Sequence, residues 1–209
     1  MFLKITRITN LLISIAAIVM MALMLGADVA RIARFVLPHV VYTVTSYPVE
    51  ILQLLLFYYL ASVLIFFNEK RSIVISFLTF LCVIAITDIA LATLTSSAAF
   101  VVMAVLGSLV FIVMIFMVVA SFKIRSATIK FPFVLLSICL LSIGLLKVIV
   151  AVLLPYIIDN FGGYGSIYPA RIILNYINPF VIIVPVSVLI LATWINRHLA
   201  KEVVPAESW

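Results

Sequence analysis

Two ionisable side chains lie deep inside long apolar stretches of the sequence. Asp88 comes sixteen residues after Ser72, and Lys147 comes sixteen residues after Phe131. An ionised group at the centre of a transmembrane helix costs about 2.5–3.5 kcal/mol on insertion scales, so it must face protein or water. Because both stretches are expected to run in the same direction, the two residues would lie at one depth, slightly outside the midplane. Opposite charges at one depth predict an ion pair between Asp88 and Lys147, which is either a structural lock between two helices or a site that binds or moves a charged solute or a proton.

Four further polar residues occur near the starts of two other apolar stretches. Glu50 and Gln53 are three residues apart, and so are Asn175 and Asn178, a spacing that places each pair on one helical face. Glu50 also fits a cap at a helix N-terminus, where the helix dipole favours an acid. The opposite half of each stretch holds little beyond Ser and Thr. This asymmetry predicts an outward-opening polar pocket, closed below by apolar side chains, with these ligand-binding residues: Asp88, Lys147, Gln53, Asn175, Asn178 and Glu50.

Two prolines follow the asparagine pair. Pro179 and Pro185 would each remove an i to i−4 backbone hydrogen bond from a helix at this position. A carbonyl freed inside lipid must be satisfied by neighbouring side chains or by a water-lined cavity, and interrupted spans mark binding sites in many transporters. Proline kinks also occur in transmembrane helices that transport nothing, so the kink supports a site only together with the polar residues beside it.

The amino-acid composition of the chain predicts the secondary-structure elements that must position these residues. The 209 residues are 67% hydrophobic and only 10% charged, with a mean hydropathy of +1.44, whereas soluble domains have roughly 25% charged residues. This excludes a soluble enzyme domain, a disordered chain and a disulfide scaffold. The sequence predicts an all-α integral membrane protein, a six-transmembrane-helix bundle forming one polytopic domain over residues 1–209. The predicted spans are approximately 8–29, 49–67, 73–93, 98–121, 131–154 and 172–195.

The distribution of basic residues predicts the orientation of the bundle. With the N-terminus inside, nine Lys and Arg residues fall on the cytoplasmic side, whereas only Arg31, Arg34 and Arg171 fall outside. Short cytoplasmic loops carry the excess of positive charge, so both termini are predicted to be cytoplasmic in a plasma or bacterial inner membrane. The net charge then needs no nucleic-acid partner. The predicted cytoplasmic set is Lys4, Arg7, Lys70, Arg71, Lys123, Arg125, Lys130, Arg197 and Lys201.

The longest connections are predicted on the outer side, over residues 30–48 and 155–171. The first is expected to begin as an interfacial continuation of span one, because Asp28, Arg31 and Arg34 recur every three residues on one helical face. The second contains three of the six glycines of the chain and is expected to be a loop.

Small residues recur at helical spacing in two spans. Ser137, Gly144 and Ala151 repeat every seven residues in the fifth, and Ala104 and Ser108 form a small-xxx-small pair in the fourth. Such stripes allow helix backbones to approach closely. They predict tight packing of both spans within the bundle.

Several kinds of catalytic site do not fit the sequence. His39 and His198 are predicted on opposite sides of the membrane, so they could not bind one metal or haem together. Cys82 and Cys139 lie inside apolar spans and are most simply core residues. A Ser/Lys dyad using Lys147 has no serine marked by a motif. The sequence therefore predicts a protein that is not an enzyme and needs no metal or cofactor.

Two functional hypotheses remain. The first is solute binding or transport through the outer polar pocket, with a small solute as partner. The second is a non-catalytic structural or assembly subunit of a larger membrane complex, in which Asp88, Lys147 and the small-residue stripes contact partner membrane subunits. Both place the protein in a lipid bilayer. They differ in whether water reaches Gln53, Asp88 and Asn178.

Overall fold

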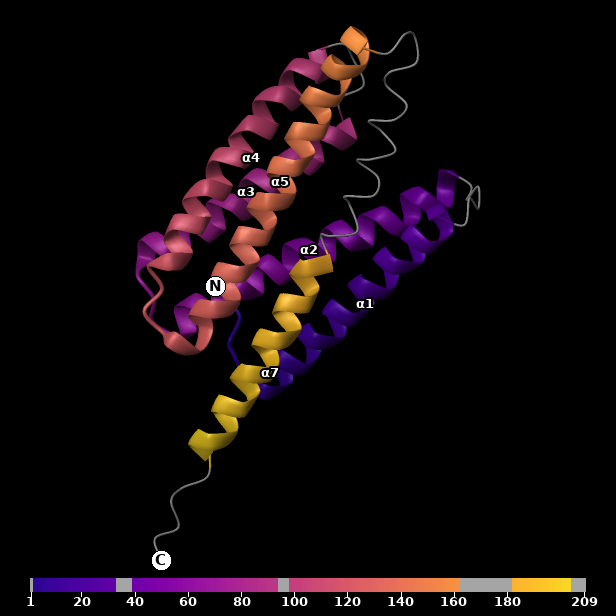
Figure 1. Cartoon of the computed structure of the whole chain (residues 1–209). Helices are drawn as coiled ribbons and strands as arrows, with labels where there is room; N and C mark the ends of the chain where they lie inside the picture. Colours follow the sequence, from indigo (N-terminus) through magenta and orange to yellow (C-terminus); the bar gives the residue numbers. More distant parts are fainter. Residues whose placement is uncertain (1, 33–38, 94–97, 162–181, 204–209) are drawn as a thin grey trace, which may run out of the picture.

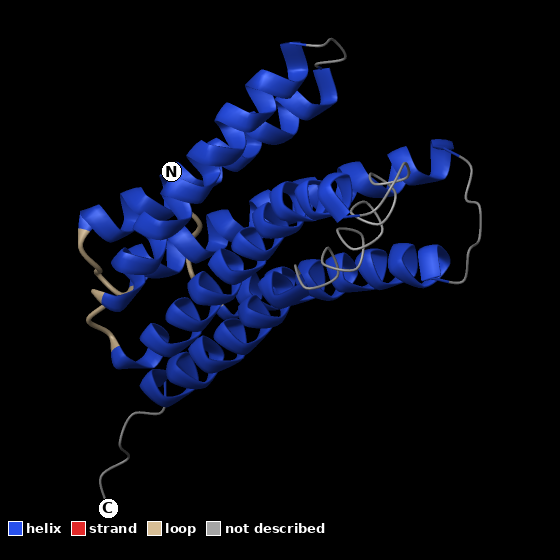
Figure 2. Ribbon diagram, turned by 45° about the horizontal axis from the view of Figure 1, so that its top comes forward, coloured by secondary structure: helices blue, strands red, loops and turns tan. Residues whose placement is uncertain are grey.

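The computed structural model describes residues 2–32, 39–93, 98–161 and 182–203, and within these ranges the only secondary structure is helical (Figures 1 and 2). Five of the helices contain a stretch long and apolar enough to cross a membrane, and α3 adds the shorter apolar stretch Arg71–Thr87. The chain is therefore a bundle of apolar helices suited to a membrane. The helices are α1 (Arg7–Ile32), α2 (His39–Phe66), α3 (Arg71–Thr93), α4 (Ala98–Phe122), α5 (Ala127–Phe161) and α7 (Ile183–Val203).

Three helices extend seven or more residues beyond their predicted spans, and one of them is α7, which ends at Val203, eight residues after the predicted end at 195. Helix α2 begins at His39, ten residues early, and continues through Pro48. Helix α5 has 35 residues and extends to Phe161. At 1.5 Å per residue α5 is about 52 Å long, well beyond a hydrocarbon core of about 30 Å. The predicted connections over 30–48 and 155–171 are therefore too long, because residues 39–48 and 155–161 are helical, whereas residues 33–38 and 162–171 lie outside the described part of the chain. The continuation of α1 to Ile32 agrees with the helical start predicted for the first connection.

Helices adjacent in sequence pack against each other from α1 to α5, and α7 contacts α1, α2 and α5. In Figure 1, α3, α4 and α5 form one group, and α1, α2 and α7 form the other. The start of α1, the end of α7 and the α2–α3 and α4–α5 connections lie at one end of the bundle. Toward the opposite end, α1 and α2 lean away from α3, α4 and α5 in Figures 1 and 2.

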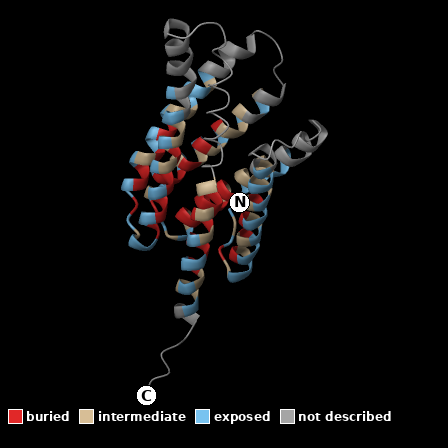
Figure 3. Cartoon of the chain, turned by 45° about the vertical axis from the view of Figure 1, so that its right-hand side comes forward, coloured by how far each residue is buried: buried red, intermediate tan, exposed pale blue. Residues whose placement is uncertain are grey.

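Burial divides the bundle into two halves. In the half near the termini, here called the packed half, the helices bury apolar side chains against one another (Figure 3). In the other half, here called the open half, none of the described side chains is buried. The packed half comprises residues 5–20, 56–64, 69–83, 113–124, 129–140 and 184–195. The open half comprises residues 21–29, 47–55, 84–90, 105–112 and 141–149.

Aromatic and small side chains bring the helices of the packed half together. Phe57 of α2 meets Phe80 of α3 edge to face, with ring centroids 5.2 Å apart. The hydroxyls of Ser121 on α4 and Ser137 on α5 are hydrogen-bonded at 2.6 Å, and both residues are buried. One element of the predicted close packing on α5 is thereby confirmed.

The second small residue on α5 also faces α4. A Cβ added to Gly144 would lie 2.6 Å from the Cε of Met114, so the absence of a side chain at Gly144 leaves room for the end of the Met114 side chain of α4. The stripe predicted on α4 behaves differently. Gly107 has nothing within 4 Å of a built Cβ, and Ser108 is exposed. Ser108 therefore does not pack within the bundle as predicted, because that face of α4 points outward, whereas the side chain of Ala104 lies outside the described residues.

Glu69 links the α2–α3 connection to the α4–α5 connection at the end of the packed half. Its carboxylate is 8% exposed and accepts hydrogen bonds from the backbone N–H of Arg125, at 3.0 and 3.1 Å, and of Ser126, at 2.8 Å. Ser126 immediately precedes α5, and its carbonyl accepts the N–H of Lys130. An anion at a helix N-terminus is stabilised by the unpaired N–H groups and the helix dipole. Glu69 therefore ties the turn before α3 to the start of α5.

Candidate functional site

The six residues predicted to bind a ligand fall in different parts of the structure. Glu50 and Gln53 lie on α2 in the open half, and both are half-buried. Asp88 lies on α3 and Lys147 on α5, but the structure does not describe their side chains. The predicted positions Asn175 and Asn178 lie outside the described residues altogether, as does Pro179. The convergence of all six residues therefore stays a prediction.

The role of Glu50 as a helix cap is wrong. Because α2 begins at His39, Glu50 is its twelfth residue and stands about three turns inside the helix. The unpaired N–H groups that favour an acid are confined to the first turn. A half-buried carboxyl group in the interior of an apolar helix has no such stabilisation. This position gives Glu50 more functional interest than a cap would have.

The helix register relates the heights of Asp88 and Lys147. Phe77 of α3 and Phe133 of α5 stack edge to face with centroids 5.2 Å apart, which aligns the two helices at that level. Asp88 is eleven residues beyond Phe77, or about 16 Å along the axis, and Lys147 is fourteen beyond Phe133, or about 21 Å. The two backbone positions thus differ by about one turn in height, within the open half.

Pro185 lies at the beginning of α7, two residues after its first residue, Ile183. The first N–H groups of a helix have no intrahelical partner, so a proline here breaks no hydrogen bond of α7. Pro185 is also buried. Within the described part of the chain, Pro185 therefore marks a helix start, and α7 runs from there to Val203 without interruption.

A hollow opens where α7 begins, between α1, α5 and α7. Its volume is about 520 Å³, within the range of about 300–1,000 Å³ typical of ligand pockets. It spans the boundary between the two halves, because Cys139 and Val186 belong to the packed half, whereas Leu25 and Ile143 belong to the open half. The lining residues that the structure describes are Leu25, Cys139, Ser142, Ile143, Ile182, Ile183 and Val186. None of these described residues carries a charge, so this wall of the hollow is mainly apolar.

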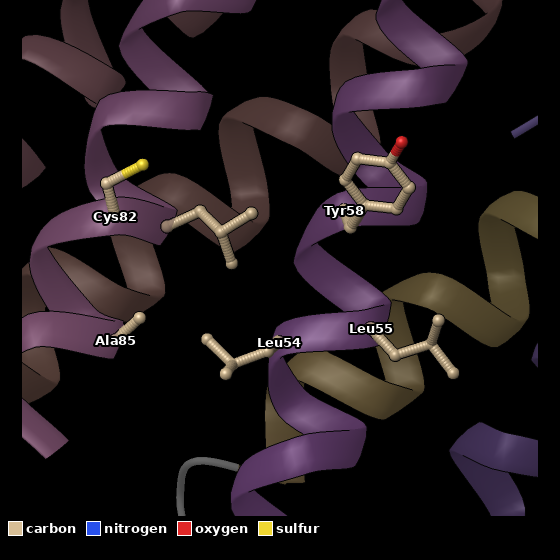
Figure 4. Close-up of a pocket in the computed structure, with 6 residues that line it drawn as sticks. Leu54, Leu55, Tyr58, Cys82 and Ala85 are labelled. Atoms are coloured by element: carbon tan, nitrogen blue, oxygen red, sulfur yellow. The ribbon is translucent and has the colours of Figure 1, made fainter. Parts of the chain in front are cut away.

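A second hollow, of about 390 Å³, lies between α2 and α3. It is lined by Leu54, Leu55 and Tyr58 of α2 and by Cys82 and Ala85 of α3, and Figure 4 shows Leu54 extending from α2 into the space between the two helices. Cys82 is exposed, and Leu55 is 36% exposed. The hollow is a groove on the apolar outer face of the bundle. The expectation that Cys82 is a core residue is wrong, whereas Cys139 is half-buried.

The sequence analysis missed a buried polar cluster in the packed half. Asn10 of α1 is 0% exposed. Its side-chain N–H donates to Asn196 of α7 at 2.9 Å, and its side-chain oxygen accepts from the hydroxyl of Tyr59 of α2 at 2.9 Å. The expectation that this half holds little beyond Ser and Thr is therefore wrong. The sequence gives one indication of this cluster, the amide side chains of Asn10 and Asn196 in or beside apolar segments. Their contact could not be predicted, because only the tertiary structure brings together residues 186 positions apart.

The two histidines lie near opposite ends of the bundle. His198 packs on Phe67, just beyond the end of α2, with ring centroids 5.9 Å apart. His39 is the first residue of α2, about 42 Å away along that 28-residue helix. This separation prevents the two side chains from binding one metal ion. Among the described residues, no three His, Cys, Asp or Glu side chains come together.

Comparison with known proteins gives no match: no protein-family model, no curated protein and no solved structure is significantly similar to the chain. The function must therefore be argued from the geometry of the bundle.

Proposed function

We propose that this chain is a membrane protein that binds a solute in its open half, as a step in transport and without a catalytic reaction. The observation that carries the proposal is the distribution of burial. Every side chain described as buried lies in the packed half, whereas no described side chain of the open half is buried. In this proposal the packed half forms the apolar floor of a binding chamber, and the helices of the open half form its walls.

The polar residues of the open half support this reading. Glu50 and Gln53 are half-buried in the interior of α2, and Asp88 and Lys147 occupy similar heights on α3 and α5. Ionisable residues at membrane depth are costly and face protein or a water-filled cavity. Water in the chamber would lower the free-energy cost of placing Glu50, Asp88 and Lys147 in the open half.

We further propose that the packed half faces the cytoplasm of a cell membrane. All basic side chains described near that end are exposed, and Glu69 is the one acidic side chain described beside them. An excess of Lys and Arg is typical of the cytoplasmic side. The exposed basic residues are Lys4, Arg7, Lys70, Arg71, Lys123, Arg125, Lys130 and Arg197.

The proposal is tested by water access from the outer side. In a variant with Cys82 and Cys139 replaced by alanine, Gln53→Cys is expected to react with a membrane-impermeant thiol reagent added to intact cells. Ala61→Cys is the matched control, because Ala61 is two turns away on the same helix and 0% exposed. We expect at least a tenfold faster reaction at Gln53→Cys. Equal rates at both positions would contradict the proposal.

One observation favours assembly into a larger complex as a second candidate. The face of α4 that carries Gly107 and Ser108 points outward, with open space beside Gly107. Small residues on an outer face allow a partner helix to approach. If the chain is an assembly subunit, Gly107→Leu should release a partner or a second copy from the purified complex and leave water access at Gln53 unchanged. Purification in mild detergent with mass spectrometry would identify that partner.

A further inference from the structure

Five exposed basic side chains lie on or beside the two connections that Glu69 links. Lys70 directly follows Glu69, and the backbone N–H of Arg125 donates to the Glu69 carboxylate. Lys130 lies four residues after Ser126 on α5, about 6 Å along the helix axis. The basic side chains are exposed, whereas Glu69 is buried and its carboxylate faces backbone N–H groups. This surface, here called the basic platform, comprises Lys70, Arg71, Lys123, Arg125 and Lys130.

The two connections hold the basic platform in a defined shape. Asn68, just beyond the end of α2, has a left-handed backbone conformation with φ of 53°. Its N–H donates to the carbonyl of Ile65 at 2.9 Å, and the N–H of Glu69 donates to that of Leu64 at 3.0 Å. These two bonds form a Schellman motif, which ends the helix in a tight turn. In the other connection, the side chain of Ile124 is buried and anchors the chain beside Arg125. The five cations are therefore brought to one surface by hydrogen bonds that do not involve their own side chains.

Exposed phenylalanines accompany the cations of the basic platform. Phe122 is 53% exposed and precedes Lys123, whereas Phe131 is 65% exposed and follows Lys130. The stretch of α4 that is long and apolar enough to cross a membrane ends at Phe122. The platform thus lies where an apolar helix surface ends. A lipid covers the rings with hydrocarbon and offers its headgroup to the cations beside them, whereas a soluble anion leaves the rings in water.

We propose that the basic platform binds the phosphate of an anionic phospholipid in the adjoining leaflet. Clusters of about four to eight Lys and Arg residues immediately beyond a transmembrane helix attract anionic lipid. Phosphatidylcholine also carries a phosphate, but its quaternary ammonium group cancels that charge, so attraction to the platform favours an anionic headgroup. This binding goes beyond the proposed solute chamber and is independent of it, because every cation of the platform lies at the end of the packed half.

The test measures which lipid stays with the full chain. The protein is reconstituted in nanodiscs that contain equal amounts of phosphatidylglycerol and phosphatidylcholine, extracted in mild detergent, and analysed for retained lipid by native mass spectrometry. We expect phosphatidylglycerol to be retained about fivefold more often, the preference that one cation near an anionic surface gives, or more. The preference should decrease as the salt concentration rises, because salt screens exposed charges.

Two double variants remove the same charge from different places. Arg71→Gln with Arg125→Gln removes two cations of the basic platform and should abolish the preference for phosphatidylglycerol. Arg7→Gln with Arg197→Gln is the matched control and should retain it, because these exposed side chains lie at the same end of the bundle but on α1 and α7. Equal loss in both double variants would overturn the inference and indicate attraction by net charge alone. If the first variant fails to fold, Lys123→Gln with Lys130→Gln replaces it.

Glycerol 3-phosphate supplies the headgroup chemistry without hydrocarbon. Added in solution at the concentration of the lipid, it should leave the retained phosphatidylglycerol unchanged, because it offers nothing to cover Phe122 and Phe131. Full displacement would overturn the lipid as the occupant and indicate a site for a free phosphate group. Equal retention of the two lipids by the unsubstituted chain would overturn the basic platform as a binding surface.

Discussion

The packed and open halves of the bundle are built from similar residues and differ in what those residues contact. On α2, eight of the nine residues from Leu56 to Leu64 are buried, whereas none from Tyr47 to Leu55 is. Both segments are dominated by large apolar side chains. The first is surrounded because α2 contacts α1, α3 and α7. In a membrane, apolar composition makes a segment soluble in lipid, and only neighbouring helices make it part of a core.

Shortening a leucine side chain on either side of the boundary between the two halves should give the largest difference in the free energy of unfolding. Leu60→Ala removes a side chain that is 2% exposed and is expected to lower the free energy of unfolding by about 2–4 kcal/mol, because it leaves a cavity. Leu55→Ala, on the same helix but 36% exposed, should cost less than about 1 kcal/mol. Denaturant unfolding in mixed micelles measures both. Similar losses would show that the open half is packed too.

A substitution at the boundary sharpens the comparison. Gly144→Leu places side-chain atoms against Met114 and is expected to destabilise the protein by about 1–3 kcal/mol, since helices α4 and α5 must separate or the Met114 side chain must move. Gly107→Leu on the open face of α4 is the control and should be neutral for the isolated chain, because nothing lies within 4 Å of its built Cβ. A shift in thermal unfolding by the control instead would indicate that this face is covered.

The polar cluster of the packed half should contribute less than its apolar contacts. Asn10→Ala removes both hydrogen bonds of the amide and is expected to cost about 1–2 kcal/mol. A double-mutant cycle with Asn196→Ala should give a coupling energy of about 0.6 kcal/mol, the average for hydrogen bonds between transmembrane helices, and no more than about 1.7 kcal/mol. Additive losses would mean that the two amides do not meet. The matched control is Ser76→Ala, whose hydroxyl bonds only the backbone of its own helix.

The smallest effect is expected from the predicted ion pair of the open half. If Asp88 and Lys147 pair, Asp88→Asn and Lys147→Met should each lower thermal stability, and the double variant should recover about 0.5 kcal/mol or more, because a lone charge at membrane depth is worse than none. Water in the open half would screen the pair and reduce this coupling. Strictly additive losses would show that the two residues act separately.

Much of the helical framework was predictable from hydropathy. The predicted bounds of α1, α3 and α4 lie within three residues of those observed, because their ends coincide with charged or small polar residues such as Arg7, Arg71 and Lys123. The bounds of α2 and α5 were not predictable in this way. Their helices continue through Pro48 and Pro155, since a helix continues wherever its remaining backbone groups can be satisfied. The candidate site was predictable only as a set of polar positions in one half.

The sequence by itself determined the class of this protein: a chain that is 67% hydrophobic with 10% charged residues forms apolar helices, because helices satisfy backbone hydrogen bonds within lipid. Only the tertiary structure decided which helix faces meet. In the structure, Asn10 is hydrogen-bonded to Asn196, and the Glu69 carboxylate accepts a hydrogen bond from Ser126 just before α5. Gly107 of α4 faces outward. The physical reason is that lipid accepts any apolar face equally. Hydropathy therefore specifies which segments enter the membrane, whereas shape complementarity and scarce polar contacts specify how they pack.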